Sequence, residues 1–293
     1  MTIQYKLGTG RVDGASTPLV LVDGRIYPLV ELLGAEGPPD LEEVFARWDA
    51  LGPDIAERVA KLDGPGLDPS TIAFQAPLSN PRKVICIGTN YHDHLEEMNV
   101  THVPEFPYAF LRPQTSLAAH GEEIRLPEGA DLIDWEAELG IVIGRRFGPG
   151  DKGDPLDAVA GYTVLNDISA RDWIANRPWV GIDWVMQKGW DKFQPTGPWI
   201  TPARFVDDPQ DLDIELTVNG VVKQKSNTGK MIFSVADIIR HLAAIMTLEP
   251  GDIIATGTPA GVGFGRQPQE FIKSGDRVSV TVEGLGTLEN RFV

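Results

Sequence analysis

The sequence predicts a mixed α+β protein whose main part is a β-barrel or a β-sandwich. Apolar runs of strand length recur along the chain, and Pro and Gly residues punctuate the loops between them. Only residues 234–246 have the clear periodicity of a long amphipathic helix. Because strands do not alternate regularly with helices, the pattern disfavours a doubly wound α/β sheet.

Composition limits the classes of function. The formal net charge of −16 argues against nucleic-acid and anionic-membrane partners, because both need a basic surface. No apolar run reaches the roughly 18 residues of a transmembrane helix, and residues 1–6 lack the basic-then-apolar build of a signal peptide. The single cysteine, Cys86, excludes an internal disulfide and is expected to fill core space. We therefore expect a cytoplasmic protein.

Residues 1–75 are expected to form a small α+β domain, and residues 76–293 the main domain. In the small domain, Asp23-Gly24 is typical of a tight turn between two short strands. A helix should begin after Asp40, and its apolar stripe should end at Pro53 before a second helical piece. Since no polar cluster suggests chemistry here, we interpret this domain as a lid or an interface, joined to the rest by a linker over 63–80.

The main domain should contain strands at 83–87, 134–144, 161–166, 213–218, 221–224, 252–255 and 278–282. Asn219-Gly220 predicts a hairpin, and the Ser234/Asp237 pair predicts a capped helix start. Residues 103–117 and 174–187 are expected to be irregular loops, which are often functional when they are long.

Three acidic residues indicate a metal site. Glu136 and Glu138 lie two apart at the start of a buried strand, so they share a face. Two buried carboxylates repel one another, and a divalent cation removes that cost. Asp167 follows another apolar strand and completes the set if the two strands are neighbours. All-oxygen ligands suit Mg²⁺, Mn²⁺ or Ca²⁺ rather than Zn²⁺.

A second candidate is a histidine–carboxylate pair. His94 and Glu97 stand three apart, so on a helix they can touch, which suits a general base acting on water. By spacing alone His92 is equally available and would pair with Glu96.

Three cations are candidates for holding an anionic or carbonyl substrate: Arg112, Arg171 and Lys188. The turn at 256–263 lacks the ending of a phosphate-binding P-loop. Its backbone amides, including that of Gly257, and the Thr258 hydroxyl are instead expected to contact a substrate carboxylate.

Four motifs together resemble the fumarylacetoacetate hydrolase family. They are Gly88-Thr89-Asn90-Tyr91 with His94 and Glu97, then Asp134-Trp135-Glu136-Ala137-Glu138-Leu139, then Asn166-Asp167-Ile168-Ser169-Ala170-Arg171-Asp172, and Thr256-Gly257-Thr258-Pro259-Ala260-Gly261-Val262-Gly263. The resemblance runs from about residue 83 to the C-terminus.

The resemblance implies a mixed β-roll, a homodimer, and Mg²⁺, Mn²⁺ or Ca²⁺ on Glu136, Glu138 and Asp167. It also implies a β-dicarbonyl acid as the small-molecule substrate. It gives His94 and Glu97 the role of a water-activating dyad, makes Lys188 the active-site lysine, and places Arg171 and Thr258 at substrate-contacting positions.

The chain departs from the family pattern at several positions. Gln187 stands where a glycine precedes the lysine, Lys192 replaces a threonine, and Ile174 replaces a glutamine that some members carry. The tryptophan-containing stretch 175–184 is longer than usual. These differences bear on the substrate more than on the metal.

Three functions are compatible with these residues. The first is a metal-dependent hydrolase that cleaves a C–C bond of a β-diketo acid, such as an acylpyruvate, a fumarylpyruvate or another 2,4-diketo acid. The second is a decarboxylase or isomerase on the same scaffold, of the oxaloacetate or hydroxymuconate type. The third is a non-catalytic binding protein that kept only the fold.

Overall fold

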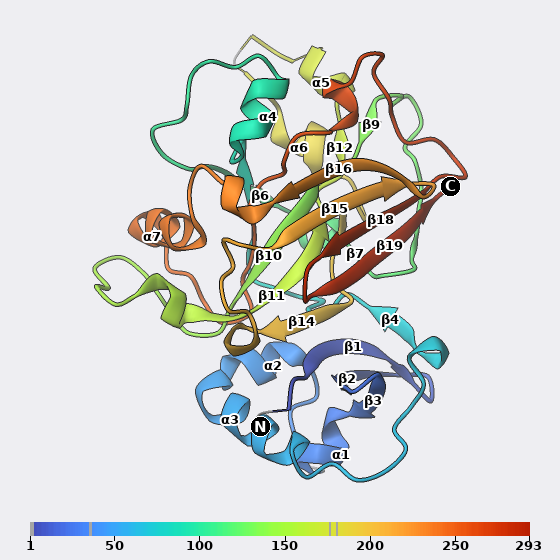
Figure 1. Cartoon of the computed structure of the whole chain (residues 1–293), viewed down its shortest axis with the longest axis vertical. Helices are drawn as coiled ribbons and strands as arrows, with labels where there is room; N and C mark the ends of the chain where they lie inside the picture. The colour runs from blue at the N-terminus through green and yellow to red at the C-terminus, as the bar shows by residue number, and fades with distance from the viewer. Residues whose placement is uncertain (1–2, 35–36, 176, 180) are drawn as a thin grey trace.

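The computed structural model describes residues 3–34, 37–175, 177–179 and 181–293, and its mixed α+β architecture confirms the predicted class (Figure 1). Parts of two expectations, on the start of the chain (Met1, Thr2) and on the stretch 175–184 (Asn176, Val180), lie outside these residues. Within the described ranges, no helix combines the length and the apolar character needed to cross a bilayer.

A ten-stranded mixed sheet runs through the described part of the molecule. In spatial order its strands are β3 (Arg25–Pro28), β2 (Ala15–Val22), β1 (Lys6–Val12), β14 (Trp199–Pro202), β11 (Val159–Asn166), β10 (Ala137–Ile143), β17 (Ile253–Ala255), β5 (Val84–Gly88) and β6 (Tyr108–Arg112), with β4 (Ala73–Gln75) paired to β1. A five-stranded sheet packs against it and contains β16 (Val221–Asn227), β15 (Asp213–Val218), β18 (Arg277–Val282), β19 (Gly286–Phe292) and β8 (Glu123–Ile124). Both sheets end in edge strands, so in the described residues the arrangement is two packed sheets.

Short strand pairs and helices complete the structure. The pairs are β9 (Ile133–Asp134) with β12 (Ser169–Ala170), and β7 (Leu117–Ala118) with β13 (Gln194–Pro195). The helices are α1 (Leu29–Leu33), α2 (Leu41–Ala46), α3 (Trp48–Val59), α4 (His92–Glu97), α5 (Asp172–Ala175), α6 (Trp184–Lys188) and α7 (Val235–Ile245).

The central strands β10 and β11 are buried along their whole length because hydrophobic cores cover both faces of the sheet. On β10, Leu139 and Ile141 belong to the core between the two sheets, whereas Val142 faces a second core that includes the N-terminal helices. This double coverage explains why the sequence of β10 is an almost continuous apolar run. It also means that Glu136 and Glu138, which share the face of Val142, enter a dry environment.

Several local predictions are confirmed. Asp23 and Gly24 adopt the positive φ of a tight hairpin turn, and Asn219 and Gly220 do the same between β15 and β16. At the start of α7, Ser234 and the Asp237 side chain form a reciprocal capping box.

Other local predictions are wrong. Pro53 does not end an apolar stripe but lies inside α3, because Leu51, Ile55 and Val59 continue the buried face across it. The expected irregular loop 103–117 contains strand β6, and the loop 174–187 contains most of helix α6. Strand β1 was not anticipated, and it joins the N-terminal strands to β14 through the pairs Leu7↔Ile200 and Gly8↔Trp199. In Figure 1, β1 and β14 lie at the junction between the lower and upper parts of the molecule.

Candidate metal centre and catalytic dyad

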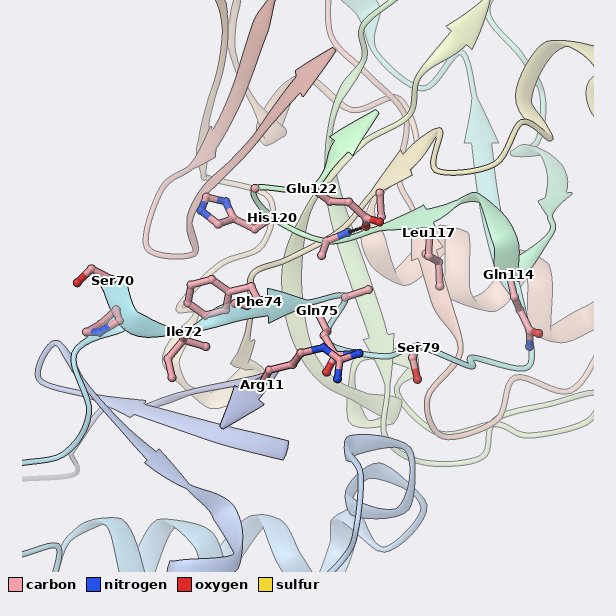
Figure 2. Close-up of a pocket in the computed structure, with 16 residues that line it drawn as sticks. Arg11, Ser70, Ile72, Phe74, Gln75, Ser79, Gln114, Leu117, His120 and Glu122 are labelled. Carbon is pink, nitrogen blue, oxygen red and sulfur yellow. Dashed lines mark hydrogen bonds between the residues drawn. The ribbon is translucent and has the colours of Figure 1, made fainter. Parts of the chain in front are cut away.

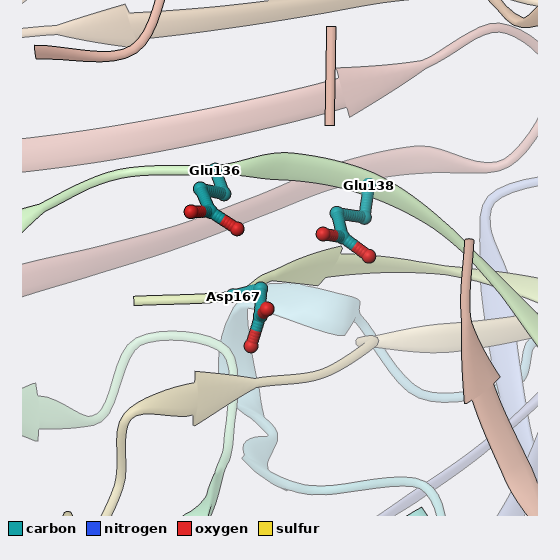
Figure 3. A group of neighbouring side chains, drawn as sticks. All are labelled: Glu136, Glu138 and Asp167. Atoms are coloured by element: carbon teal, nitrogen blue, oxygen red, sulfur yellow. The ribbon is translucent and has the colours of Figure 1, made fainter. Parts of the chain in front are cut away.

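Glu136, Glu138 and Asp167 converge on one buried space (Figure 3). One carboxylate oxygen from each residue lies within 4.8 Å of those of the other two, and the residues are at most 6% exposed. The geometry follows from strand pairing, because Ala137 of β10 lies opposite Asn166 of β11. The Asp167 N–H donates to the Glu136 carbonyl at 2.9 Å, which places Asp167 beside the two glutamates.

Lys188 and Arg171 surround Glu136 with positive charge. The Lys188 Nζ lies 2.8 Å from Glu136 Oε2 and 2.5 Å from Asp167 Oδ2, and Arg171 Nη2 lies 2.6 Å from Glu136 Oε1. Lys188 reaches this position because it ends α6, which packs against β12. Lys188 and Arg171 are both nearly inaccessible to solvent.

The two glutamates differ in charge preference although they stand two residues apart. Burial opposes ionisation of Glu136, but Lys188 and Arg171 outweigh it and lower the Glu136 pKa to about 2. Burial, together with the negative charges of Asp167 and Glu136, raises the pKa of Glu138 well above its usual range. Glu138 accepts a hydrogen bond from the Gly257 N–H at 2.9 Å. Among the described residues, no cation lies within ion-pair distance of it.

This donor set fits a hard divalent cation. All three candidate ligands are carboxylates, and a buried carboxylate with a raised pKa is one whose negative charge lacks compensation. A cation held by Glu136, Glu138 and Asp167 would supply that compensation.

Arg112 contacts the candidate metal ligand Asp167 directly. Its side chain is buried, and its guanidinium donates to the backbone carbonyls of Lys188 and Ile168 and pairs with Asp167 Oδ1 at 2.5 Å. Through these contacts Arg112 holds Asp167 and the Lys188 backbone in place. Its expected contact with a substrate stays a prediction.

Asp134 is a site residue that the sequence reasoning missed. Its Oδ2 accepts from Arg171 Nε at 2.9 Å and from the Phe264 N–H, and its Oδ1 accepts from the Gly263 N–H at 2.6 Å. Arg171 therefore bridges Asp134 and Glu136, which ties the metal centre to the loop at 261–265. The acidic start of the motif at 134–139 was the available signal, but by itself it indicates only the charged edge of a strand.

The turn at 256–263 supplies polar groups beside the carboxylates. The Gly257 N–H, expected to contact a substrate carboxylate, donates to Glu138 in this structure. Thr258 is buried, and its hydroxyl oxygen accepts from Gln224 Nε2 at 2.8 Å. The substrate contacts of Gly257 and Thr258 stay predictions.

The structure separates the two candidate histidines. His94 and Glu97 turn inward from α4, and His94 Nδ1 lies 3.3 Å from Glu97 Oε2. His92 and Glu96 are exposed on the other side of the helix. His94 also lies close enough to Glu136 for its charge to favour ionisation of that carboxylate. The pair next to the metal centre is therefore His94 with Glu97.

The residues near Lys188 that depart from the family pattern differ in how buried they are. Gln187 is buried and its Oε1 has no hydrogen-bond partner among the described atoms, whereas Lys192 lies at the surface and pairs with Glu122 at 2.8 Å. Trp184 stacks on Phe110 with ring centroids 4.5 Å apart, and Lys188 Nζ lies 5.6 Å from the Phe110 ring. Through Phe110, the tryptophan-containing stretch thus reaches the surroundings of Lys188.

A groove of about 760 Å³ lies elsewhere, between β4 and the segment 114–122 (Figure 2). Arg11, Gln75, Gln114, His120 and Glu122 line it. The three carboxylates and the dyad are absent from its lining, so this groove is distinct from the candidate metal centre.

Comparison with known proteins identifies the family. Residues 83–293 match the family model described as fumarylacetoacetate (FAA) hydrolase C-terminal. A human mitochondrial oxaloacetate tautomerase is 41% identical over 239 residues, which are 82% of this chain and 75% of that protein. The chain belongs to the fumarylacetoacetate hydrolase family, and the resemblance drawn from its motifs is confirmed.

Solved structures of family members share the fold. A fumarylacetoacetate hydrolase from Exiguobacterium antarcticum superposes with a TM-score of 0.81 at 31% identity, covering 98% of this chain and 99% of that one. A maleylpyruvate hydrolase from Sphingobium sp. SYK-6, solved with manganese(II) and pyruvate, has a TM-score of 0.80 at 29% identity and covers 98% of both chains. Relatives thus include a tautomerase and two hydrolases, one of them with a bound divalent metal.

Proposed function

We propose that this member of the fumarylacetoacetate hydrolase family is a divalent-metal-dependent hydrolase that cleaves a C–C bond of a β-diketo acid of the acylpyruvate or fumarylpyruvate type. The observation that carries the proposal is the His94–Glu97 pair, 3.3 Å apart, beside a buried set of three carboxylates. The maleylpyruvate hydrolase with manganese and pyruvate supports it, because pyruvate is the 2-oxo acid that such a cleavage releases.

Glu136, Glu138 and Asp167 would hold the cation, with Mg²⁺ or Mn²⁺ expected and Ca²⁺ also compatible with oxygen ligands. When bound, the ion supplies Lewis acidity that polarises a carbonyl and stabilises an enolate. The ion also makes the site positive overall. Its two charges and those of Arg112, Arg171 and Lys188 exceed the charges of the four buried carboxylates Asp134, Glu136, Glu138 and Asp167, which suits an anionic keto acid.

The chain's own residues account for the proton transfers. A carboxylate only accepts hydrogen bonds, so His94 Nδ1 carries a proton toward Glu97, which leaves Nε2 free to take a proton from water. The water oxygen bonds to the distal acyl carbon, and the C–C bond breaks. The electron pair of that bond stays on the carbon beside the 2-keto group, which takes up the proton that His94 removed from the water. Lys188 places positive charge beside Glu136 and Asp167, where negative charge develops.

A second candidate is keto–enol tautomerisation or decarboxylation of oxaloacetate, favoured by the tautomerase at 41% identity. In that chemistry no water attacks a carbon, so the dyad matters less. The metal carboxylates would serve both reactions.

His94→Ala separates the two candidates. We expect hydrolysis of an acylpyruvate at saturating Mn²⁺ to fall by about 100-fold or more, because general base catalysis is lost. Conversion of oxaloacetate in the same preparation should change little. Product mass from a substrate panel measures the first reaction and ultraviolet absorbance of the enol the second. Full acylpyruvate hydrolysis by the variant would remove His94 as the base. A parent protein that converts oxaloacetate but does not hydrolyse acylpyruvates would favour the second candidate.

The homodimer and the cytoplasmic location expected from the sequence are part of the proposal. The net charge of −16 supports the absence of a nucleic-acid or anionic-membrane partner. Light scattering of the purified chain tests the dimer.

A further inference from the structure

The loop at 261–265 approaches Glu97 more closely than a side chain on the loop would allow. The Gly261 N–H donates to Glu97 Oε1 at 2.9 Å, while Glu97 Oε2 faces His94 Nδ1 at 3.3 Å. Gly265 lies against the same carboxylate, and a Cβ at this position would come within 2.5 Å of Glu97 Cδ and 2.9 Å of Oε1. Glu97 therefore occupies space that exists only because residue 265 has no side chain.

The loop is fixed and cannot retreat easily from Glu97. Asp134 accepts from the backbone N–H groups of Gly263 and Phe264, and the Trp135 indole donates to the Gly261 carbonyl at 3.0 Å. On its other side, Gly263 packs so closely that an added Cβ would lie 1.9 Å from the Glu270 carbonyl oxygen. Asp134 and Trp135 are both buried, so their hydrogen bonds hold the loop backbone in place.

The helix that carries Glu97 is fixed as well. Leu95 is buried, and Asp93 at the start of α4 accepts from the Ala260 N–H at 3.2 Å and from the Ser226 hydroxyl at 2.7 Å. With both backbones held, the free end of the Glu97 side chain is the part able to move. A methyl group at 265 would displace that carboxylate by roughly an ångström, which breaks the contact with His94.

We propose that Gly265 determines reaction specificity at this site. Glycine at 265 leaves room for the contact between His94 and Glu97, and this contact allows His94 to activate water. A larger residue leaves the metal carboxylates intact and restricts the protein to reactions that need no activated water. The inference rests on the proposed hydrolase function. It adds that Gly265, which touches neither substrate nor metal, positions the base His94 through Glu97.

Gly265→Ala tests the inference. We expect acylpyruvate hydrolysis to fall by about 100-fold, as for loss of the base itself. Mn²⁺ affinity and oxaloacetate conversion should stay within about twofold, because Glu136, Glu138 and Asp167 are untouched. The ring ¹⁵N spectrum of His94 in the metal-free protein gives a readout without turnover. It should change from a single Nδ1–H form to a mixture of tautomers.

The control variants distinguish positioning from general damage. Gly153→Ala removes an exposed glycine whose Cβ would meet its nearest neighbour at 3.9 Å, and it should leave every readout unchanged. In a Glu97→Ala background the clash is gone, so adding Gly265→Ala should cost nothing further. An equal loss in both backgrounds, or an unchanged His94 spectrum, would overturn the inference. If the parent protein does not hydrolyse acylpyruvates, the proposed function fails, and the ¹⁵N readout then decides the role of Gly265 in positioning His94 independently.

Discussion

Glu136 and Glu138 lie on the same face of the same chain segment, yet their surroundings are opposite. Glu136 pairs with Lys188 and Arg171, and its pKa falls to about 2 although burial opposes ionisation. Glu138 has the Gly257 N–H as its donor, and burial together with the charges of Asp167 and Glu136 raises its pKa. The protein therefore compensates one side of the carboxylate cluster with its own cations and leaves the other side to an added cation.

The comparison shows that similar side chains at one site have different structural roles. Removing a charge from the compensated side leaves buried cations without a partner, whereas removing it from the uncompensated side relieves repulsion. The stability of the metal-free protein should therefore change in opposite directions for substitutions only two residues apart.

The largest effect is expected for Glu138→Gln. We expect activity with Mn²⁺ to fall by about 1000-fold and Mn²⁺ affinity by about 100-fold, since one of three anionic ligands is lost. The metal-free variant should nevertheless unfold at a higher temperature than the parent at pH 8, because a neutral glutamine avoids the cost of burying a carboxyl that must either hold a proton or carry an uncompensated charge. Activity, isothermal titration calorimetry and thermal unfolding in EDTA measure the three quantities. A variant that binds Mn²⁺ normally contradicts the assignment of Glu138 as a ligand.

Glu136→Gln should instead destabilise the metal-free protein. Lys188 and Arg171 would lose a shared partner in a dry environment, which typically costs about 3 kcal/mol in the free energy of unfolding. Urea unfolding in EDTA measures this loss. If Glu138→Gln proves more destabilising than Glu136→Gln, the contrast between the two sides is wrong.

The smallest effect concerns pH. Because the pKa of Glu138 is raised, the folded metal-free protein binds a proton there more tightly than the unfolded chain does, and the stability gained from this proton is lost as pH rises through the folded pKa. Glu136 has the opposite dependence, since its contribution is lost as pH falls from about 4.5 toward 2. Metal must displace the Glu138 proton, so Mn²⁺ affinity should weaken by about tenfold per pH unit below that pKa.

Calorimetry in two buffers of different ionisation enthalpy measures the released proton. At pH values below the Glu138 pKa, the parent protein should release one proton for each Mn²⁺ that binds. Affinity that does not change between pH 8 and pH 5 would show that Glu138 is already ionised, and the contrast with Glu136 would then be smaller than inferred.

Local chemistry in the sequence predicted much of the fold and the cluster. Alternation along a strand placed Glu136 and Glu138 on one face, and the Asn219-Gly220 turn required positive φ whatever the surroundings. Asp167 could be placed beside Glu136 and Glu138 only on the condition that their two strands pair. The β10–β11 register supplies that condition.

The sequence could not show which charged residues, far apart in the chain, form ion pairs or hydrogen bonds with one another. The ion pair of Arg112 with Asp167, 55 residues further along the chain, could not be inferred from spacing. Asp134 went unrecognised because its donors, Arg171, Gly263 and Phe264, come from distant segments. Pro53 was misjudged for a similar reason, since the tertiary burial of its neighbours outweighs its missing N–H group.

The pairing of β1 with β14 has a practical consequence for dissecting this protein. A shortened chain that begins at residue 83, where the family match starts, would strip β14 of its neighbour on that side and uncover Trp199 and Ile200. Exposed backbone donors beside large apolar side chains invite strand addition by other molecules. The N-terminal strands thus serve as a permanent cover for the sheet, and removing them would leave a sheet edge prone to self-association.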